Sequence, residues 1–138
     1  MTERPMSEIV RRKPVTLPAA ATVQQACRHM RDQRIGAVLV VDPQLRLLGI
    51  FTGRDAVRLL ADGHNPAHTH LAQVMTRNPE HMPPTHTAIQ ALRLMHDGGF
   101  RHVPVCENGR VLGIVSSGDF RAQEHARLDD ETGIWERI

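Results

Sequence analysis

The sequence predicts an α+β fold made of two tandem copies of one small unit, each in the order strand, helix, strand, strand, helix. Three observations lead to this expectation. Residues 6–60 can be aligned with residues 71–124 at an offset of 65 residues, which falls to 64 after the predicted hairpin turn. Both copies carry helix-capping patterns followed by apolar residues at helical spacing, and both carry short apolar runs of strand length. A chain of 138 residues has room for one compact domain or two small ones packed together.

The first helix of each copy is predicted by a capping box. Thr22 and Thr87 are each followed three residues later by Gln, a pattern that satisfies unpaired backbone donors at a helix start. Apolar residues follow at i, i+3, i+4 and i+7 spacing, which indicates one buried face. Short extended stretches around Thr16 and His81 precede these helices in the two copies.

Two apolar strands joined by a turn follow each helix. We expect the strands at Ala37–Val41 and 47–51 in the first copy, and at 103–106 and 111–115 in the second. The second turn contains Asn-Gly, the strongest two-residue hairpin signal, whereas the first turn is one residue longer. This difference accounts for the change of offset.

A second helix is expected directly after each returning strand. The helix starts are marked by Thr52 with Asp55 and by Ser116 with Asp119. The first of these helices should end near Asp62, before Gly63, and the second near Ala126.

Composition excludes several classes of protein. The net charge of +2 and the scarcity of aromatic residues (three Phe, one Trp and no Tyr) make nucleic acid an improbable partner. The two cysteines form no Cys-x-x-Cys pair, which fits the reducing cytoplasm. The sequence contains neither an apolar run of membrane-spanning length nor a signal peptide, so we expect no membrane association.

Catalytic and metal sites are poorly supported. The sequence contains no Gly-x-Ser-x-Gly elbow, no Walker-type loop and no His-Glu-x-x-His motif, so an enzyme is not expected. His64, His68 and His70 lie in a polar connecting stretch at loose spacing and without supporting groups, so no metal is assigned to them.

The repeated segments resemble a known family. Gly-Ile-Phe-Thr-Gly-Arg-Asp at 49–55, Gly-Ile-Val-Ser-Ser-Gly-Asp at 113–119 and Phe-Arg-His-Val-Pro-Val at 100–105 look like parts of a pair of cystathionine-β-synthase (CBS) domains, or Bateman module. The resemblance covers about residues 6–126. It implies two repeats packed with pseudo-two-fold symmetry, dimerisation of two such pairs, and two clefts that accept AMP, ADP, ATP or S-adenosylmethionine.

This resemblance divides the chain into four parts. They are a first CBS repeat at 6–62, a linker at 63–70, a second CBS repeat at 71–126 and a C-terminal tail at 127–138. Trp135 and Ile138 are apolar points on the acidic tail and are candidates for packing across a dimer.

Two interpretations of the hydroxyl and carboxylate pairs stay open. Thr52 with Asp55 and Ser116 with Asp119 form simple capping boxes in one interpretation. In the other, the carboxylate accepts hydrogen bonds from ribose hydroxyls while the helix N-terminus faces phosphate. The two roles are compatible because the groups that cap a helix can also line a cleft.

In the family that the sequence resembles, the carboxylate of one repeat generally lines a cleft together with the strand start of the other repeat. The two clefts are expected to differ, because the two strand starts carry different residues. Where the second copy has an Arg-His pair, the first has Gly and Ala, so phosphate binding is expected in one cleft and is less expected in the other. The first cleft joins Thr52 and Asp55 to His81, Arg101 and His102, and the second joins Ser116 and Asp119 to Thr16, Gly36 and Ala37.

The function expected from the resemblance is that of a stand-alone regulatory module. Such a module would bind an adenosine nucleotide, use no catalytic cofactor, and signal to a protein effector or through its own homodimer. The alternative is a dimerisation or docking module that needs no ligand. A third possibility, RNA or DNA binding through an Arg-rich surface, requires binding that weakens steeply with salt.

Overall fold

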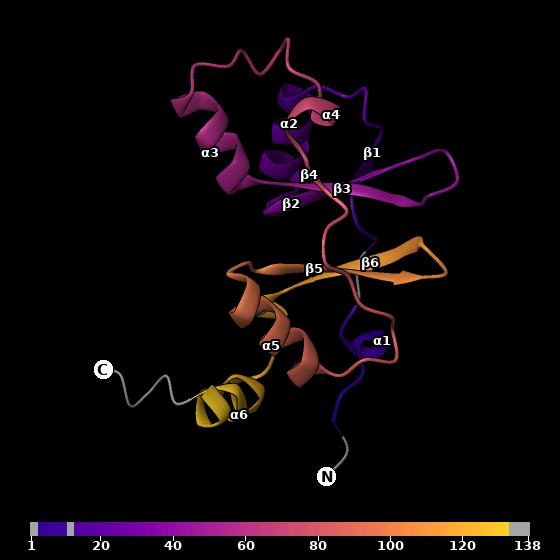
Figure 1. Cartoon of the computed structure of the whole chain (residues 1–138), viewed down its shortest axis with the longest axis vertical. Coiled ribbons are helices and arrows are strands. Elements are labelled where there is room, and N and C mark those ends of the chain that lie inside the picture. The colour runs from indigo at the N-terminus through magenta and orange to yellow at the C-terminus, as the bar shows by residue number, and fades with distance from the viewer. Residues whose placement is uncertain (1–2, 11–12, 133–138) are drawn as a thin grey trace. The chain divides into compact units, whose positions relative to one another are not determined.

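The computed structural model describes residues 3–10 and 13–132 and confirms an α+β fold with two repeats (Figure 1). Trp135 and Ile138 lie outside the described residues. In chain order the elements are α1 (Met6–Ile9), β1 (Thr16–Leu17), α2 (Val23–Gln33), β2 (Ala37–Val41), β3 (Leu47–Thr52), α3 (Gly53–Ala61), α4 (Leu71–Val74), β4 (Thr76–Arg77), α5 (Ala88–Gly98), β5 (His102–Glu107), β6 (Arg110–Ser116), the 3-10 turn η1 (Ser117–Asp119) and α6 (Ala122–Thr132). Within the described ranges, no helix is long and apolar enough to cross a membrane.

The chain folds into two compact units. The first-repeat unit comprises Lys13–Glu80 and Asn108–Val111. Among the described residues, the second-repeat unit comprises 3–10, His81–Glu107 and 112–132. These divisions differ from the repeat boundaries expected from the sequence, because residues 3–10 belong to the unit built mainly from the second repeat.

The first-repeat unit is built on a four-stranded sheet in the order β1-β2-β3-β4. Strand β2 is buried along its whole length, runs parallel to β1 and pairs antiparallel with β3. In this register Ala37 pairs with Thr52, so the start of β2 lies beside the end of β3. The capping box of α2 is present as predicted: Gln25 N donates to Thr22 Oγ1 at 3.2 Å, and Thr22 N donates to Gln25 Oε1 at 2.8 Å.

The second-repeat unit contains the antiparallel hairpin β5-β6. Helix α5 begins after the predicted cap at Thr87 and ends at Gly98. The C-cap residue Gly99 follows, and its φ of 71° is the left-handed conformation that glycine adopts without strain. The extended stretch predicted near His81 forms one isolated bridge, from Met82 to Val105, whereas its counterpart near Thr16 forms strand β1.

The second helix was predicted correctly in the first repeat and incorrectly in the second. Helix α3 starts directly after Thr52 and stops before Gly63. In the second repeat the chain makes the 3-10 turn η1, becomes extended at Phe120 and enters α6 only at Ala122. Phe120 is buried, and the extended backbone at this residue separates the turn from the helix. The helix also continues to Thr132, beyond the end expected near Ala126.

The opening helix of each repeat explains why the units and the repeats differ. Met6 N donates to His86 O at 2.7 Å, and Met6 is fully buried in the core of the second-repeat unit. The matching Leu71 N donates to Ala21 O at 2.8 Å, and Leu71 is fully buried in the core of the first-repeat unit. Each unit is therefore completed by a short helix that the sequence periodicity assigns to the other repeat.

Candidate functional site

The first candidate turn joins β3 to α3 in the first-repeat unit. Asp55 N donates to Thr52 Oγ1 at 3.3 Å, while Thr52 N and Thr52 Oγ1 each lie 2.9 Å from Asp55 Oδ2. The capping interpretation is therefore correct in structural terms. It uses only Oδ2, and the other carboxylate oxygen, Oδ1, has the exposed Arg58 Nη1 at 4.0 Å. The Asp55 side chain is 19% exposed, and the lone pairs of Oδ1 are not used by the cap.

The residues around this turn come from neighbouring strand ends. Gly53 N donates to Gly36 O at 3.0 Å, and Ala37 pairs with Thr52 across the sheet. Thr16 opens β1 and pairs with Leu39, two residues along β2 from Ala37. The first-repeat unit thus brings together five of the predicted site residues, namely Thr16, Gly36, Ala37, Thr52 and Asp55.

The second candidate turn joins β6 to η1 in the second-repeat unit. Ser116 N donates to Asp119 Oδ2 at 2.7 Å, and Ser116 Oγ lies 3.3 Å from the same oxygen. Ser117 N donates to Arg101 O at 3.0 Å, which repeats the bond between Gly53 and Gly36. This unit holds the other five predicted residues. His81, Arg101 and Asp119 are exposed, and His102 and Ser116 are half-buried.

Burial controls the charge of His102. Desolvation lowers the pKa of this imidazole, the nearby Asp119 carboxylate opposes the shift by raising the pKa, and Arg101 adds to the lowering. The net shift is downward, so His102 is mainly neutral at neutral pH. Of the predicted Arg-His pair, only Arg101 supplies a permanent positive charge.

The lowered pKa of His102 predicts a pH dependence of stability. As pH falls below about 6.5, the unfolded chain protonates this residue before the folded chain does, so the free energy of unfolding decreases. The contribution of His102 is fully present above the unfolded pKa and is lost as pH falls through the folded pKa. We expect wild type to lose more stability than His102→Gln between pH 7 and pH 5 in urea titrations. Parallel profiles for the two proteins would contradict this assignment, since the other histidines are common to both.

The predicted grouping into two clefts joins residues of different units. It places Thr52 and Asp55 with Arg101, and Ser116 and Asp119 with Gly36, and it stays a prediction. In the part of the chain that the structure describes, no group of three or more His, Cys, Asp or Glu is arranged to hold a metal ion.

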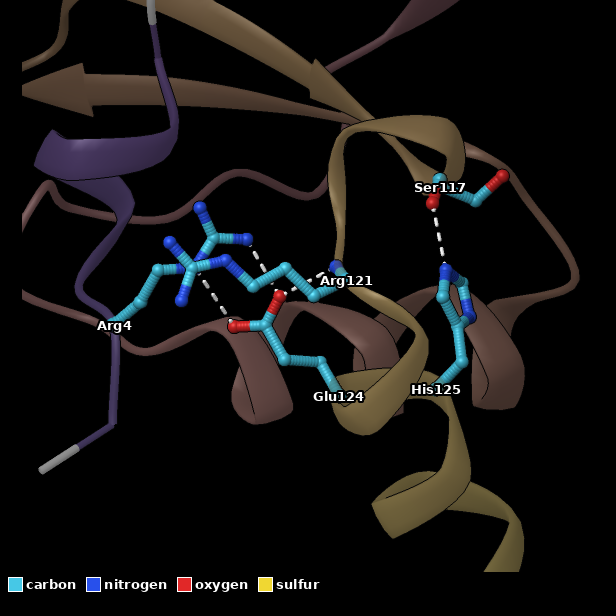
Figure 2. Close-up of polar contacts among 5 residues, drawn as sticks. All are labelled: Arg4, Ser117, Arg121, Glu124 and His125. Atoms are coloured by element: carbon cyan, nitrogen blue, oxygen red, sulfur yellow. Dashed lines mark hydrogen bonds and ion pairs between the residues drawn. The ribbon is translucent and has the colours of Figure 1, made fainter. Parts of the chain in front are cut away.

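Sequence reasoning missed one contact to the second turn. His125 Nε2 lies 2.9 Å from Ser117 O, in the turn between Ser116 and Asp119 (Figure 2). The expected helix placed His125 near its C-terminal end, whereas the structure places it in the first turn of α6. The sequence offers one weak signal, because Glu124 stands three residues after Arg121 at the spacing of a capping box.

Comparison with known proteins shows what the chain is similar to. The family model for the CBS domain matches residues 6–62 and 71–124. A CBS domain-containing protein of Arabidopsis thaliana is 42% identical over 114 residues, which cover 82% of this chain and 21% of that relative. The chain therefore spans about a fifth of the relative's length.

Solved structures share the fold. A CBS domain protein from Pyrobaculum aerophilum in complex with AMP matches with a TM-score of 0.83 at 24% identity, covering 91% of this chain and 98% of that one. A CBS domain pair in complex with 5′-methylthioadenosine and S-adenosyl-L-methionine matches with a TM-score of 0.79 at 23% identity, covering 95% and 99%.

Proposed function

Because the chain belongs to the CBS domain family and carries two repeats in tandem, we propose that it is a regulatory module that binds an adenosine nucleotide. The observation that carries this proposal is the turn at Thr52 and Asp55. One carboxylate oxygen of Asp55 caps α3, and the other takes no part in the cap. A half-buried carboxylate with a spare oxygen at a helix start suits the two hydroxyls of a ribose, while the helix N-terminus suits phosphate.

The charges of the candidate residues favour a phosphate-bearing ligand for the set that contains Thr52, Asp55, His81, Arg101 and His102. Arg101 is exposed, permanently charged and able to donate two parallel hydrogen bonds to a phosphate. The set formed by Thr16, Gly36, Ala37, Ser116 and Asp119 contains no cation. We therefore assign AMP, ADP or ATP to the first set and an uncharged or less charged adenosine compound to the second.

Two solved structures with this fold support the class of ligand, since one contains AMP and the other contains 5′-methylthioadenosine and S-adenosyl-L-methionine. In our proposal the ligand acts as a regulator, no catalytic cofactor is needed, and the bound state is passed to a protein effector or to a homodimer. A ligand transmits a signal only if it binds one arrangement of the protein better than another. Cys27 and Cys106 are both free thiols, which fits a cytoplasmic location.

Thermal unfolding with and without ligand tests this function. AMP, ADP, ATP, S-adenosylmethionine and NADH are each added at millimolar concentration to the purified protein. A ligand at about 100 times its Kd stabilises the folded state by about 2.7 kcal/mol, and this raises the midpoint of a chain of this size by roughly 8 °C. A selective rise with one adenosine compound supports the proposal. Equal midpoints with every compound and without any would contradict it.

One observation favours the second candidate, a dimerisation or docking module that needs no ligand. Val57 and Leu60 lie one turn apart on α3 and are 66% and 62% exposed. Exposed apolar side chains at this spacing form a stripe that a partner helix can cover. Light scattering of wild type and of Val57→Ser/Leu60→Ser separates the two functions. A ligand-independent dimer that the double substitution dissociates would favour docking.

A further inference from the structure

The start of α6 is held by an ion pair from the N-terminal segment, defined here as residues 3–10. Arg4 Nη2 donates to Glu124 Oε1 at 2.6 Å, and Arg4 Nε donates to Glu124 Oε2 at 3.0 Å (Figure 2). The two side chains are only 13% and 16% exposed. The hydrogen bonds from Arg4 lower the pKa of Glu124, so the carboxylate stays charged and the bidentate pair stays intact over the physiological range.

Glu124 also closes the first turn of α6. Its Oε1 accepts a hydrogen bond from Arg121 N at 2.7 Å, which satisfies a backbone donor at the helix start. The same oxygen therefore receives one bond from the helix backbone and one from Arg4. Arg4 thus holds the group that fixes where α6 begins.

The next residue of α6 holds the candidate turn. A carbonyl oxygen can only accept, so His125 Nε2 donates the 2.9 Å bond to Ser117 O. The His125 ring also packs edge-on against the buried Phe120, with ring centroids 6.3 Å apart and planes at 87°. Because Ser117 N is bound to Arg101 O, the turn is held on both sides of its backbone.

The residues at the matching positions of the first repeat lack the side chains that form this network. At the offset of 64 the positions that match Arg121, Glu124 and His125 are Val57, Leu60 and Ala61. The position that matches Arg4, at the offset of 65, is Thr69, whose hydroxyl donates to Asn65 O within its own segment. The Thr52 to Asp55 turn is therefore an internal control for the turn from Ser116 to Asp119.

We propose that Arg4 and His125 are positioning residues for the second turn: the N-terminal segment sets the geometry of Ser116 and Asp119 through the first turn of α6. Binding of a ligand at this turn is consequently coupled to docking of the N-terminal segment. A docked segment favours ligand binding, and a bound ligand favours docking by the same factor. The ligand in this statement rests on the proposed function, whereas the positioning of the turn does not.

Amide hydrogen exchange in ligand-free protein tests the positioning directly. In Arg4→Gln we expect the amides of Ser116 and Ser117 to exchange about tenfold faster, the factor that corresponds to losing one charge-assisted hydrogen bond. The amides of Thr52 and Gly53 should exchange as in wild type. The Val105 amide in β5 reports whether the whole unit has loosened. Unchanged exchange at Ser116 and Ser117, or an equal increase at Val105, overturns the proposal.

Two substitutions of His125 separate its hydrogen bond from its packing. His125→Phe keeps a ring against Phe120 but has no donor for Ser117 O, so it should speed exchange of the turn as Arg4→Gln does. His125→Gln keeps an N–H donor, so the amides of Ser116 and Ser117 should exchange as slowly as in wild type. In the double variant Arg4→Gln/His125→Phe, exchange should match that of His125→Phe alone, because both residues act through one route. Additive effects would overturn the shared route.

Calorimetric titration with 5′-methylthioadenosine, an uncharged adenosine compound of the kind assigned to the set with Ser116 and Asp119, tests the coupling to a ligand. If wild type binds it, Arg4→Gln should weaken the site that Asp119→Ala also weakens, by about tenfold, and leave the AMP affinity of the site sensitive to Asp55→Ala unchanged. Equal 5′-methylthioadenosine affinities in wild type and Arg4→Gln overturn the coupling. If wild type binds no adenosine compound, the proposed function fails, and the exchange experiment alone decides whether Arg4 and His125 position the turn.

Discussion

We expect Asp55→Ala to remove most of the proposed nucleotide-induced rise in unfolding midpoint while lowering the stability of the ligand-free protein by only about 1 kcal/mol. The small effect on folding follows from the cap, because Asp55 Oδ2 accepts from Thr52 N and Thr52 Oγ1 at the start of α3. The large effect on binding follows from the carboxylate itself. Hydrogen bonds to a charged acceptor contribute about 1.5–3 kcal/mol each, so losing one or two ribose contacts weakens binding by about 10-fold or more.

Gln25→Ala is the matched control for this substitution. Gln25 stands at the start of α2 in the same unit and accepts from Thr22 N at 2.8 Å, as Asp55 accepts from Thr52 N at 2.9 Å. Both substitutions remove the same half of a capping box, but Gln25 is outside the predicted site. Nucleotide affinities measured by calorimetry should fall in Asp55→Ala and remain at the wild-type value in Gln25→Ala. An unchanged affinity in Asp55→Ala would show that Asp55 only caps the helix.

The features that the sequence predicted well are those decided by neighbours along the chain. The capping boxes at Thr22, Thr52 and Thr87 each depend on a residue three positions away, so they can be predicted from the sequence alone. The hairpin turn at Asn108 and Gly109 is equally local: both residues have positive φ, as such a turn requires.

The features that the sequence did not predict depend on contacts between residues that are far apart in the sequence. Arg4 and Glu124 are 120 residues apart, and neither belongs to a motif that points to the other. The start of α6 depends on the burial of Phe120, where the first repeat has the smaller Ala56 and the helix continues without a break. The same distinction applies to the candidate site. The carboxylates of Asp55 and Asp119 could be predicted from the local capping pattern, whereas the contact of His125 with Ser117 O could not.

Met6→Ala should lower the free energy of unfolding by about 2–5 kcal/mol, the cost of truncating a fully buried methionine. Its effect should be concentrated in the second-repeat unit, although Met6 opens the first sequence repeat. The reason is that Met6 belongs to the same buried cluster as Ile89 on α5 and Val103 on β5. Leu71→Ala should have the converse effect, since Leu71 belongs to the cluster that contains Val23 and Phe51.

Native-state hydrogen exchange read by mass spectrometry distinguishes the two units. Met6→Ala should accelerate exchange in peptides from α5 and β5 more than in those from α2 and β2, and Leu71→Ala should reverse the order. Ser7→Ala is the matched control, because Ser7 is exposed on the same short helix and its truncation should change stability by less than about 0.5 kcal/mol. If Met6→Ala accelerated hydrogen exchange in α2 and β2 as much as in α5 and β5, the two units would unfold together. The two repeats would then form one cooperative fold, because each unit contains the opening helix of the other repeat.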